Sequence, residues 1–368
     1  MSKHDCNIFC MHLLDRYIIK KFLGTFFYSI GLIITIAIVF DFSEKVDDFI
    51  NKHAPAKAII FDYYLNFIPY FANLFSPLFV FISVIFFTAR MAGNTEIVAI
   101  LSSGISFRRM LVPYFISAFI LAALSFYLNG WVIPHSNKTR LAFENVYIKN
   151  PYVYKGRNIH RQISPGVYVY FESFNNSDNI GYRFSMEKIK NGAIDYKLMA
   201  DYISWNDTSK KWSVYNYFIR ENINGNDRIR QGERLDTAYT FDPSEFSRRI
   251  TYIEAMDNAE LDEFIEEERM KGAENIQFYH VEKYKRSALP FSTFILTLMG
   301  VSIASRKTRG GIGVSLGMGI LLSFTYILFM QVSYTFATNG NLPALLAVWI
   351  PNIIYAVFGI FLLQRAPK

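Results

Sequence analysis

Hydrophobic residues along the chain gather into six long runs that contain no charged side chain, and a polar block separates the first three runs from the last three. A helix needs about 20 apolar residues to cross the hydrocarbon core of a membrane. The runs reach roughly this length, so the pattern predicts six membrane-spanning helices in a three-plus-three arrangement. The predicted spans are residues 22–40, 63–89, 110–133, 287–305, 310–337 and 342–364.

The polar block at residues 134–286 has a different pattern, in which short runs of β-branched and aromatic residues alternate with Gly, Asn and Asp. Such runs are typical of strands, and two of them, with Trp205 and Trp212 beside the turn, indicate a hairpin. The predicted strands are residues 167–171, 182–189, 197–204, 212–220 and 237–241. Their spacing predicts an inserted β domain, a sandwich or jelly roll of about 110 residues.

A helix at residues 259–271 is expected to close the polar block. Asp257 or Asn258 supplies its cap, and Gly272 ends it. Its apolar stripe consists of Leu261, Phe264 and Ile265. The predicted organisation is therefore a first part with three spans at 1–133, the β domain at 134–286, and three further spans at 287–368.

The charged residues are sorted between the two sides of the predicted spans. Four short segments on one side, 1–21, 90–109, 306–309 and 365–368, hold 12 Lys/Arg and 3 Asp/Glu, whereas the polar block on the other side holds 23 of each. By the positive-inside rule, both termini face the cytosol and the polar block lies outside. The net charge of +7 thus reflects membrane topology and gives no reason to expect nucleic acid binding.

The sequence lacks the common catalytic and nucleotide-binding motifs. It contains no P-loop, G-x-S-x-G, H-E-x-x-H or C-x-x-C pattern. Cys6 and Cys10, together with His4 and His12, have a spacing that superficially fits zinc. We interpret that segment as a short disordered tail, and expect a chain that is not an enzyme and holds neither metal nor cofactor.

The predicted loop at 90–109 carries the most specific local pattern. Asn94 or Thr95 can cap a short helix at 95–103, Glu96 lies in its first turn, and Gly104 supplies a left-handed stop. The apolar face of this helix consists of Ile97, Ile100 and Leu101. Two interpretations remain open: the helix rests against lipid headgroups, or it docks a soluble protein in which a basic residue pairs with Glu96.

Small residues line one stretch of the fifth span. Gly313 and Gly317 are four positions apart, and Ser315 and Gly319 repeat that spacing. Small residues at this spacing let a second helix approach closely. We expect a packing face here, with a mobile gate as the alternative.

These features together resemble the LptF/LptG (YjgP/YjgQ) permeases of the lipopolysaccharide export transporter, from about Leu13 to Pro367. The resemblance rests on Leu14-Asp15-Arg16-Tyr17-Ile18, on Glu96, Ala99 and Gly104, on the three-plus-three layout, and on residues 305–311 and 342–352. The Leu-Asp-Arg-Tyr sequence favours the LptG member.

The resemblance implies a role in outer-membrane biogenesis, as a multi-pass permease of the bacterial inner membrane. Two such permeases pair, and an LptB-like ATPase dimer binds their loop helices, here through Glu96. The first and fifth spans form lateral gates through which lipopolysaccharide enters from the outer leaflet of the inner membrane. The periplasmic domain leads to an LptC-like protein through strand addition at a sheet edge. The ATPase performs the chemistry, and this chain converts it into movement.

The chain departs from the family pattern at the outer end of the first span. Family members can place basic residues there, where they meet lipid phosphates, whereas this chain has Asp41 and Glu44, with Lys45 as the nearest base. Lys45 is therefore a candidate phosphate contact. Two other functions share parts of this pattern. A lipoprotein-release permease usually has its large domain after the first span, and a membrane-anchored ligand sensor would have cytosolic signalling domains.

Overall fold

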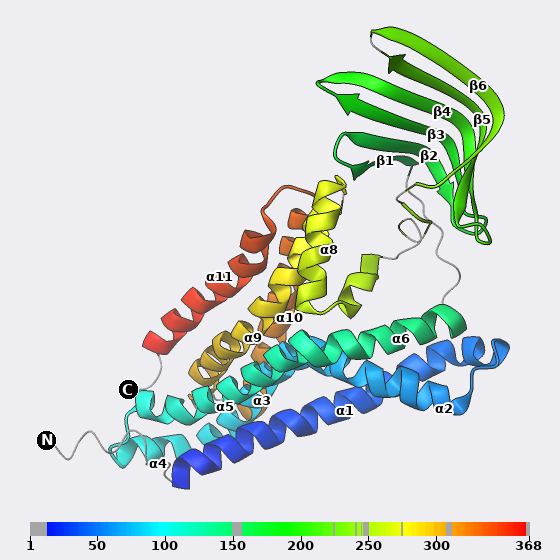
Figure 1. Ribbon diagram of the computed structural model, residues 1–368. Helices are drawn as coiled ribbons and strands as arrows, with labels where there is room; N and C mark the ends of the chain where they lie inside the picture. Colours follow the sequence, from blue (N-terminus) through cyan, green and yellow to red (C-terminus); the bar gives the residue numbers. More distant parts are fainter. Residues whose placement is uncertain are drawn as a thin grey trace, which may run out of the picture. The chain divides into compact units, whose positions relative to one another are not determined.

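The computed structural model describes residues 13–148, 157–223, 225–239, 241–243, 245, 250–273, 275–306 and 311–365 (Figure 1). Residues 4–12, where the zinc-like spacing occurs, lie outside these ranges. The chain divides into two compact units. The helical unit contains the chain up to Phe143, Glu254–Asn258 and the chain from Gln277 onward, and the second unit contains Glu144–Ile253 and Ala259–Ile276.

Among the described residues, six helices are long and apolar enough to cross a membrane, which confirms the six predicted spans. They are α1 (Leu13–Asn51), α2–η2–α3 (Ala56–Ala58, Ile59–Tyr64, Leu65–Gly93), α5–η3–α6 (Phe107–Tyr127, Leu128–Val132, Ile133–Tyr147), α9 (Ile276–Ala304), α10 (Gly311–Thr338) and α11 (Ala344–Gln364). The first four of these helices extend well beyond the predicted spans. The reason is that a charged residue ends the apolar run in the sequence without ending the helix. The boundaries drawn after residue 133 and before residue 287 remain predictions about where the chain leaves the membrane.

Two of the long helices contain a π-helical segment. These are η2 (Ile59–Tyr64) and η3 (Leu128–Val132). Pro134 follows η3 closely, and a proline ring crowds the carbonyl four residues earlier, so a widened turn at this point has a local cause. Both π segments supply polar side chains to the sites described below, as π-bulges frequently do.

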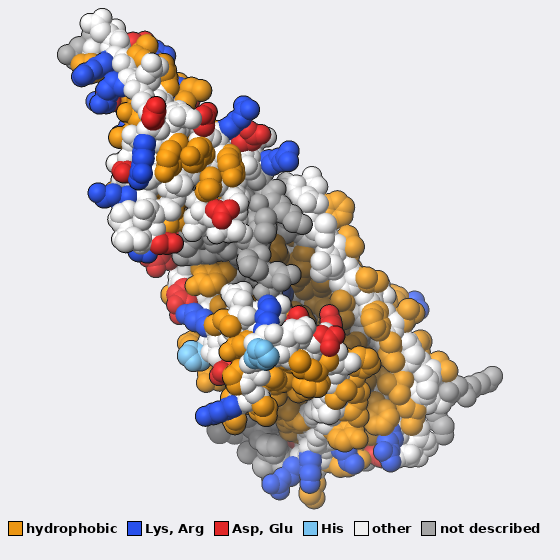
Figure 2. All heavy atoms as spheres, turned by 90° about the vertical axis from the view of Figure 1, so that its right-hand side faces the viewer, with side chains coloured by type: hydrophobic (Ala, Val, Ile, Leu, Met, Phe, Trp, Pro, Cys, Tyr) orange, Lys and Arg blue, Asp and Glu red, His pale blue; other side chains and the backbone are white. Residues whose placement is uncertain are grey.

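Helix α3 lies at the centre of the helical unit, because it contributes to two apolar clusters. One cluster joins it to α1 and α5, and the other joins it to α9, α10 and α11. By contrast, only 17% of the most apolar part of α1 and 22% of that of α10 is buried. Figure 2 shows hydrophobic side chains covering much of the face of the helical unit that it presents. Exposed apolar surface of this extent indicates contact with lipid or with another protein.

The second unit is built on one antiparallel sheet with the sequential order β1-β2-β3-β4-β5-β6 (Figure 1). The strands are β1 (Arg157–Ser164), β2 (Val167–Asn175), β3 (Ile180–Lys190), β4 (Ala193–Asn206), β5 (Lys211–Ile223) and β6 (Asn226–Thr237). The inserted β domain is thus confirmed. Its described strands form a meander, whereas a jelly roll distributes its strands over two sheets.

Four of the five predicted strands are confirmed, including the hairpin in which Trp205 pairs with Trp212. The strand predicted at 237–241 is wrong, because β6 ends at Thr237 and Phe241 instead packs into the core on one face of the sheet. There the indole Nε1 of Trp212 donates to the carbonyl oxygen of Phe241 at 2.9 Å. The polar strands β1 and β6 carry few strand-forming residues and were not predicted.

A helix follows the sheet, as expected. Helix α8 (Asn258–Met270) begins one residue before and ends one residue before the predicted limits, and Gly272 has the left-handed conformation of a helix stop, with φ +68°. A short 3-10 helix, η4 (Ile250–Ala255), leads into it. The return segment 254–258, which runs from the end of η4 to the first residue of α8, belongs to the helical unit.

Candidate functional site

The predicted loop helix is present as α4 (Glu96–Ser102), between α3 and α5. Gly104 has φ +87°, the left-handed conformation expected of the stop. Thr95 occupies the predicted N-cap position, but it is left-handed and its side chain makes no capping hydrogen bond. Thr95 instead donates from Oγ1 to the carbonyl of Asn94 at 2.6 Å.

The apolar face of α4 points into the helical unit. Ile97 is buried, and Ile100 and Leu101 are partly buried in the cluster that α1, α3 and α5 form. The outward face carries Val98, which is 59% exposed. Ala99, Ser102 and Ser103 are also exposed. The period of a helix predicts which residues share a face, but it does not say whether that face meets the same chain or another molecule.

Glu96 lies at the junction of α4 and α1. The hydroxyl of Tyr17 donates to Oε2 of Glu96 at 3.1 Å, and Nδ2 of Asn94 donates to Oε1 at 3.1 Å. Lys21 places its Nζ 5.8 Å from the centre of the Tyr17 ring. Both carboxylate oxygens of Glu96 are therefore held by donors from this chain.

An ion pair next to this junction was not predicted. Arg109 donates from Nη1 and Nη2 to the two carboxylate oxygens of Asp15, each at 2.7 Å. Asp15 is only 3% exposed, and the pair joins the start of α1 to the start of α5. Asp15 is one of three acids in the four basic segments, and that rarity was a signal that it has a specific partner.

Lys45 is engaged within the chain. Its Nζ lies 2.5 Å from Oδ1 of Asp41 and also hydrogen-bonds to the hydroxyl of Tyr63. The hydroxyl of Tyr64 donates to Oδ2 of Asp41 at 3.3 Å. Asp41 thus neutralises the candidate phosphate contact, and the two tyrosines attach η2 to α1.

The three glycines of the predicted packing face have different environments. A Cβ atom added to Gly319 would lie 2.5 Å from Cδ1 of Ile85, so α3 approaches α10 closely at this position. No atom of the described chain lies within 4 Å of such an atom at Gly313 or Gly317. Only Gly319 therefore serves packing within the chain, and the other two glycines lie on the exposed side of α10.

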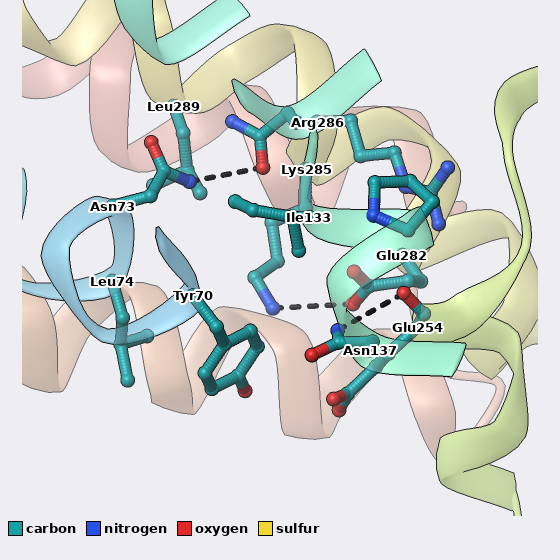
Figure 3. Close-up of a pocket in the computed structure, with 12 residues that line it drawn as sticks. Tyr70, Asn73, Leu74, Ile133, Asn137, Glu254, Glu282, Lys285, Arg286 and Leu289 are labelled. Atoms are coloured by element: carbon teal, nitrogen blue, oxygen red, sulfur yellow. Dashed lines mark hydrogen bonds and ion pairs between the residues drawn. The ribbon is translucent and has the colours of Figure 1, made fainter. Parts of the chain in front are cut away.

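A pocket with charged and amide side chains in its lining lies within the helical unit, where α3, η3, α6, α9 and the segment 254–258 meet (Figure 3). It encloses about 440 Å³ of empty space, part of which is open to solvent. Its lining residues are Tyr70, Asn73, Leu74, Asn129, Ile133, Pro134, Asn137, Glu254, Glu282, Lys285, Arg286 and Leu289.

Charged groups in the pocket are paired. Lys285 donates from Nζ to Oε2 of Glu282 at 3.1 Å, and Asn137 donates from Nδ2 to the carbonyl of Glu254 at 3.1 Å (Figure 3). The guanidinium of Arg140 lies 4.7 Å from the centre of the Tyr70 ring. The hydrogen bond from Asn137 to Glu254 attaches the return segment 254–258 to α6. Within the described ranges, no group of three His, Cys, Asp or Glu side chains is placed to hold a metal ion.

A comparison with protein families decides the identity of the chain. The family model described as Lipopolysaccharide export system permease LptF/LptG matches residues 16–365, nearly the whole sequence. The chain belongs to the LptF/LptG family. It is therefore a non-catalytic transmembrane subunit of the lipopolysaccharide exporter. A comparison with curated proteins found no match.

Membership in the LptF/LptG family sets aside the lipoprotein-release permease and the ligand sensor. The matching model covers both members of the pair, so the preference for LptG remains a prediction. In this permease the structure brings Glu96 together with Tyr17, and Lys45 together with Asp41. These partners are 79 and 4 positions apart. A contact across 79 positions leaves no periodic signal in the sequence, which is why the hydrogen bond between Tyr17 and Glu96 was not predicted.

Proposed function

We propose that this permease pairs with a second LptF/LptG-type permease, and that a cytosolic LptB-like ATPase dimer drives the pair through α4. The observation that carries this proposal is the construction of α4. Its apolar side is fixed in the helical unit, its outer side is small and exposed, and Glu96 is held at its start. A helix supported in this way transmits a push to its neighbours instead of yielding to it.

The orientation follows from charge. The loop that contains α4 carries Arg90, Arg108 and Arg109 with Glu96 as its single acid, and such loops face the cytosol. We therefore place both termini and α4 in the cytosol and the β unit in the periplasm. Docking takes place through the outward residues Val98, Ala99 and Ser102 together with Glu96. Ile97, Ile100 and Leu101 support the docking helix from within the chain.

Exposed apolar faces on α1 and α10 favour a second permease as their neighbour. Both helices are largely unburied in this chain, and α10 also exposes Gly313 and Gly317. Small residues allow the close approach of a partner helix, or a sliding contact with it. We propose that α1 of one permease and α10 of the other line each gate through which lipopolysaccharide enters.

The β unit offers one of its two sheet edges more freely than the other. On β1, the backbone N–H of Gln162 already donates to the carbonyl of Lys271 at 3.1 Å, so the segment after α8 occupies part of that edge. The opposite edge strand, β6, pairs with β5 on its inner side. We propose that an LptC-like periplasmic protein adds its strand at β6, because unpaired backbone groups on an edge strand are templates for strand addition.

Phosphate binding at Lys45 is a hypothesis that carries an electrostatic cost. A lipid phosphate that approaches this lysine has to compete with the carboxylate of Asp41, which lies 2.5 Å away. We therefore expect the first phosphate contacts to come from bases of the partner permease. Unaltered glycolipid binding in a Lys45→Ala variant would count against any direct contact with Lys45.

The proposal is tested with Glu96→Lys, which reverses the charge at the start of α4. We expect normal membrane insertion but loss of the ATPase when the chain is purified from its native membrane in mild detergent, because the lysine repels the basic residue of the partner. The copurified proteins and lipid A are identified by mass spectrometry.

The matched control is Glu267→Lys, an exposed acid on α8 with the same change of charge. It should leave the ATPase, the second permease and the lipid A bound. Retention of the ATPase by Glu96→Lys would refute docking at α4. A wild-type chain that purifies as a stable monomer without ATPase would refute the whole assembly.

A further inference from the structure

We propose that Tyr17 is a positioning residue for ATPase docking: it orients the Glu96 carboxylate and connects α4 to α1. This inference rests on the proposed docking at α4. Tyr17 lies on the second turn of α1, and its hydroxyl donates to Oε2 of Glu96 at 3.1 Å. The bond joins two helices that are 79 positions apart in the sequence.

The Glu96 side chain is held from two sides before any partner arrives. Tyr17 donates to one carboxylate oxygen and Asn94 to the other. A flexible glutamate loses rotamer freedom when it docks, at a cost that prior ordering removes. A carboxylate has about four lone-pair sites, so two remain for the guanidinium or ammonium group of a partner. The two donors thus aim the carboxylate without blocking it.

Tyr17 is itself fixed by the turn of α1 on which it lies. Its neighbour Ile18 is fully buried in the cluster that also contains Ile97 of α4. Two residues earlier, Asp15 is held by Arg109 on α5. Tyr17 is 40% exposed, but its backbone position is determined by buried contacts on both sides. Tyr17 therefore reaches Glu96 from a fixed position on α1.

A connection between α4 and α1 works in both directions. Whatever changes the position of α1 changes the orientation of Glu96, and docking at Glu96 bears on α1 through the same bond. Coupling between two sites is reciprocal for binding free energies. The structure thus assigns to Tyr17 a route by which lipid at the proposed α1 gate alters ATPase affinity.

The test is Tyr17→Phe, which keeps the ring and removes only the hydroxyl. The permease complex is purified from its native membrane and reconstituted in nanodiscs, and its ATPase is stripped and titrated back to obtain Kd. We expect an affinity about fivefold weaker, which is the effect of one ordinary hydrogen bond. The melting temperature of the stripped complex should not change, since the lost group is at the surface. The matched control is Tyr28→Phe, an exposed tyrosine on the same helix.

A double-mutant cycle separates positioning from other effects. In a Glu96→Gln background, Tyr17→Phe should have at most a twofold effect, because the two residues act through one bond. In addition, 3-fluorotyrosine at position 17 should give a ¹⁹F resonance that shifts in Glu96→Gln without any ATPase present.

Three outcomes would overturn the inference in distinguishable ways. If Glu96→Lys abolishes docking while Tyr17→Phe matches the Tyr28→Phe control, Tyr17 has no positioning role and the docking proposal stands. If Tyr17→Phe weakens docking equally in both backgrounds, it acts independently of Glu96. If neither Glu96→Lys nor Glu96→Gln changes Kd, docking at α4 fails, and the role of Tyr17 fails with it.

Discussion

Asp15 lies buried at the start of α1, and both of its carboxylate oxygens accept hydrogen bonds from Arg109. A bidentate pair of this kind combines charge with a fixed geometry. Its net contribution to stability is smaller than the cost of breaking it, because removing one partner leaves a buried charge uncompensated. The pair is therefore best tested by deleting the arginine.

Arg109→Ala is expected to destabilise the permease by about 3 kcal/mol, since Asp15 then stays buried without its cation. The measurement is the free energy of unfolding of the purified chain in mixed micelles. Arg108→Ala is the matched control, because Arg108 is the preceding residue and is exposed. Equal losses in the two variants would mean that the Asp15–Arg109 pair contributes nothing specific.

Residue-level chemistry was predictable from the sequence where it depends on local signals. Gly104 ends α4 in the left-handed conformation, as its position after an apolar turn indicates. Lys45 was identified as a base near the outer end of the first span, but its ion pair with Asp41 and its hydrogen bond to Tyr63 were not. Which side chains meet across two helices depends on the packing of those helices, and local patterns in the sequence do not reveal that packing.

Among the elements, the helices were predicted most reliably. An uncharged run of about 20 residues has few alternatives to a membrane span. The strands depended more on composition: β2 to β5 are rich in aromatic and β-branched residues, whereas β6 reads Asn226-Asp227-Arg228-Ile229-Arg230 at its start. Pairing with β5 makes a strand of this polar segment. An edge strand has fewer neighbours to pack against, so its sequence carries less of the strand signal.

Helix α10 offers a direct comparison between packing within the chain and packing with a partner. Gly319→Leu should destabilise the chain by about 1–3 kcal/mol, because the new side chain meets Ile85 of α3. Gly317→Leu should leave the free energy of unfolding unchanged, since the space beside it is open. It should instead reduce the amount of second permease that copurifies. Full pairing in Gly317→Leu would remove this position from the permease interface.

At the scale of the whole molecule, the proposal that β6 receives the periplasmic partner can be tested on the edge strand itself. Ile229 lies exposed on β6, and a charged side chain on an edge strand discourages strand addition. Ile229→Lys should therefore reduce the LptC-like protein that copurifies and leave the ATPase in place. Ile194→Lys, an exposed isoleucine on the interior strand β4, is the control. If both variants retain the periplasmic protein equally, β6 is not the docking edge.

Helix α1 is fixed near both of its ends by polar contacts. With 39 residues it extends roughly 58 Å, about twice the hydrocarbon thickness. Near its start, Asp15 pairs with Arg109. Near its end, Asp41 and Lys45 hydrogen-bond to Tyr63 of η2. Between these two sets of contacts, Gly24 and Gly31 have no neighbouring atom within 4 Å of the place where a Cβ would lie. The opposite face of the same stretch packs Phe22, Phe26 and Ile30 into the cluster that α3 and α5 form. At the proposed gate, α1 is therefore expected to move together with that cluster and not on its own.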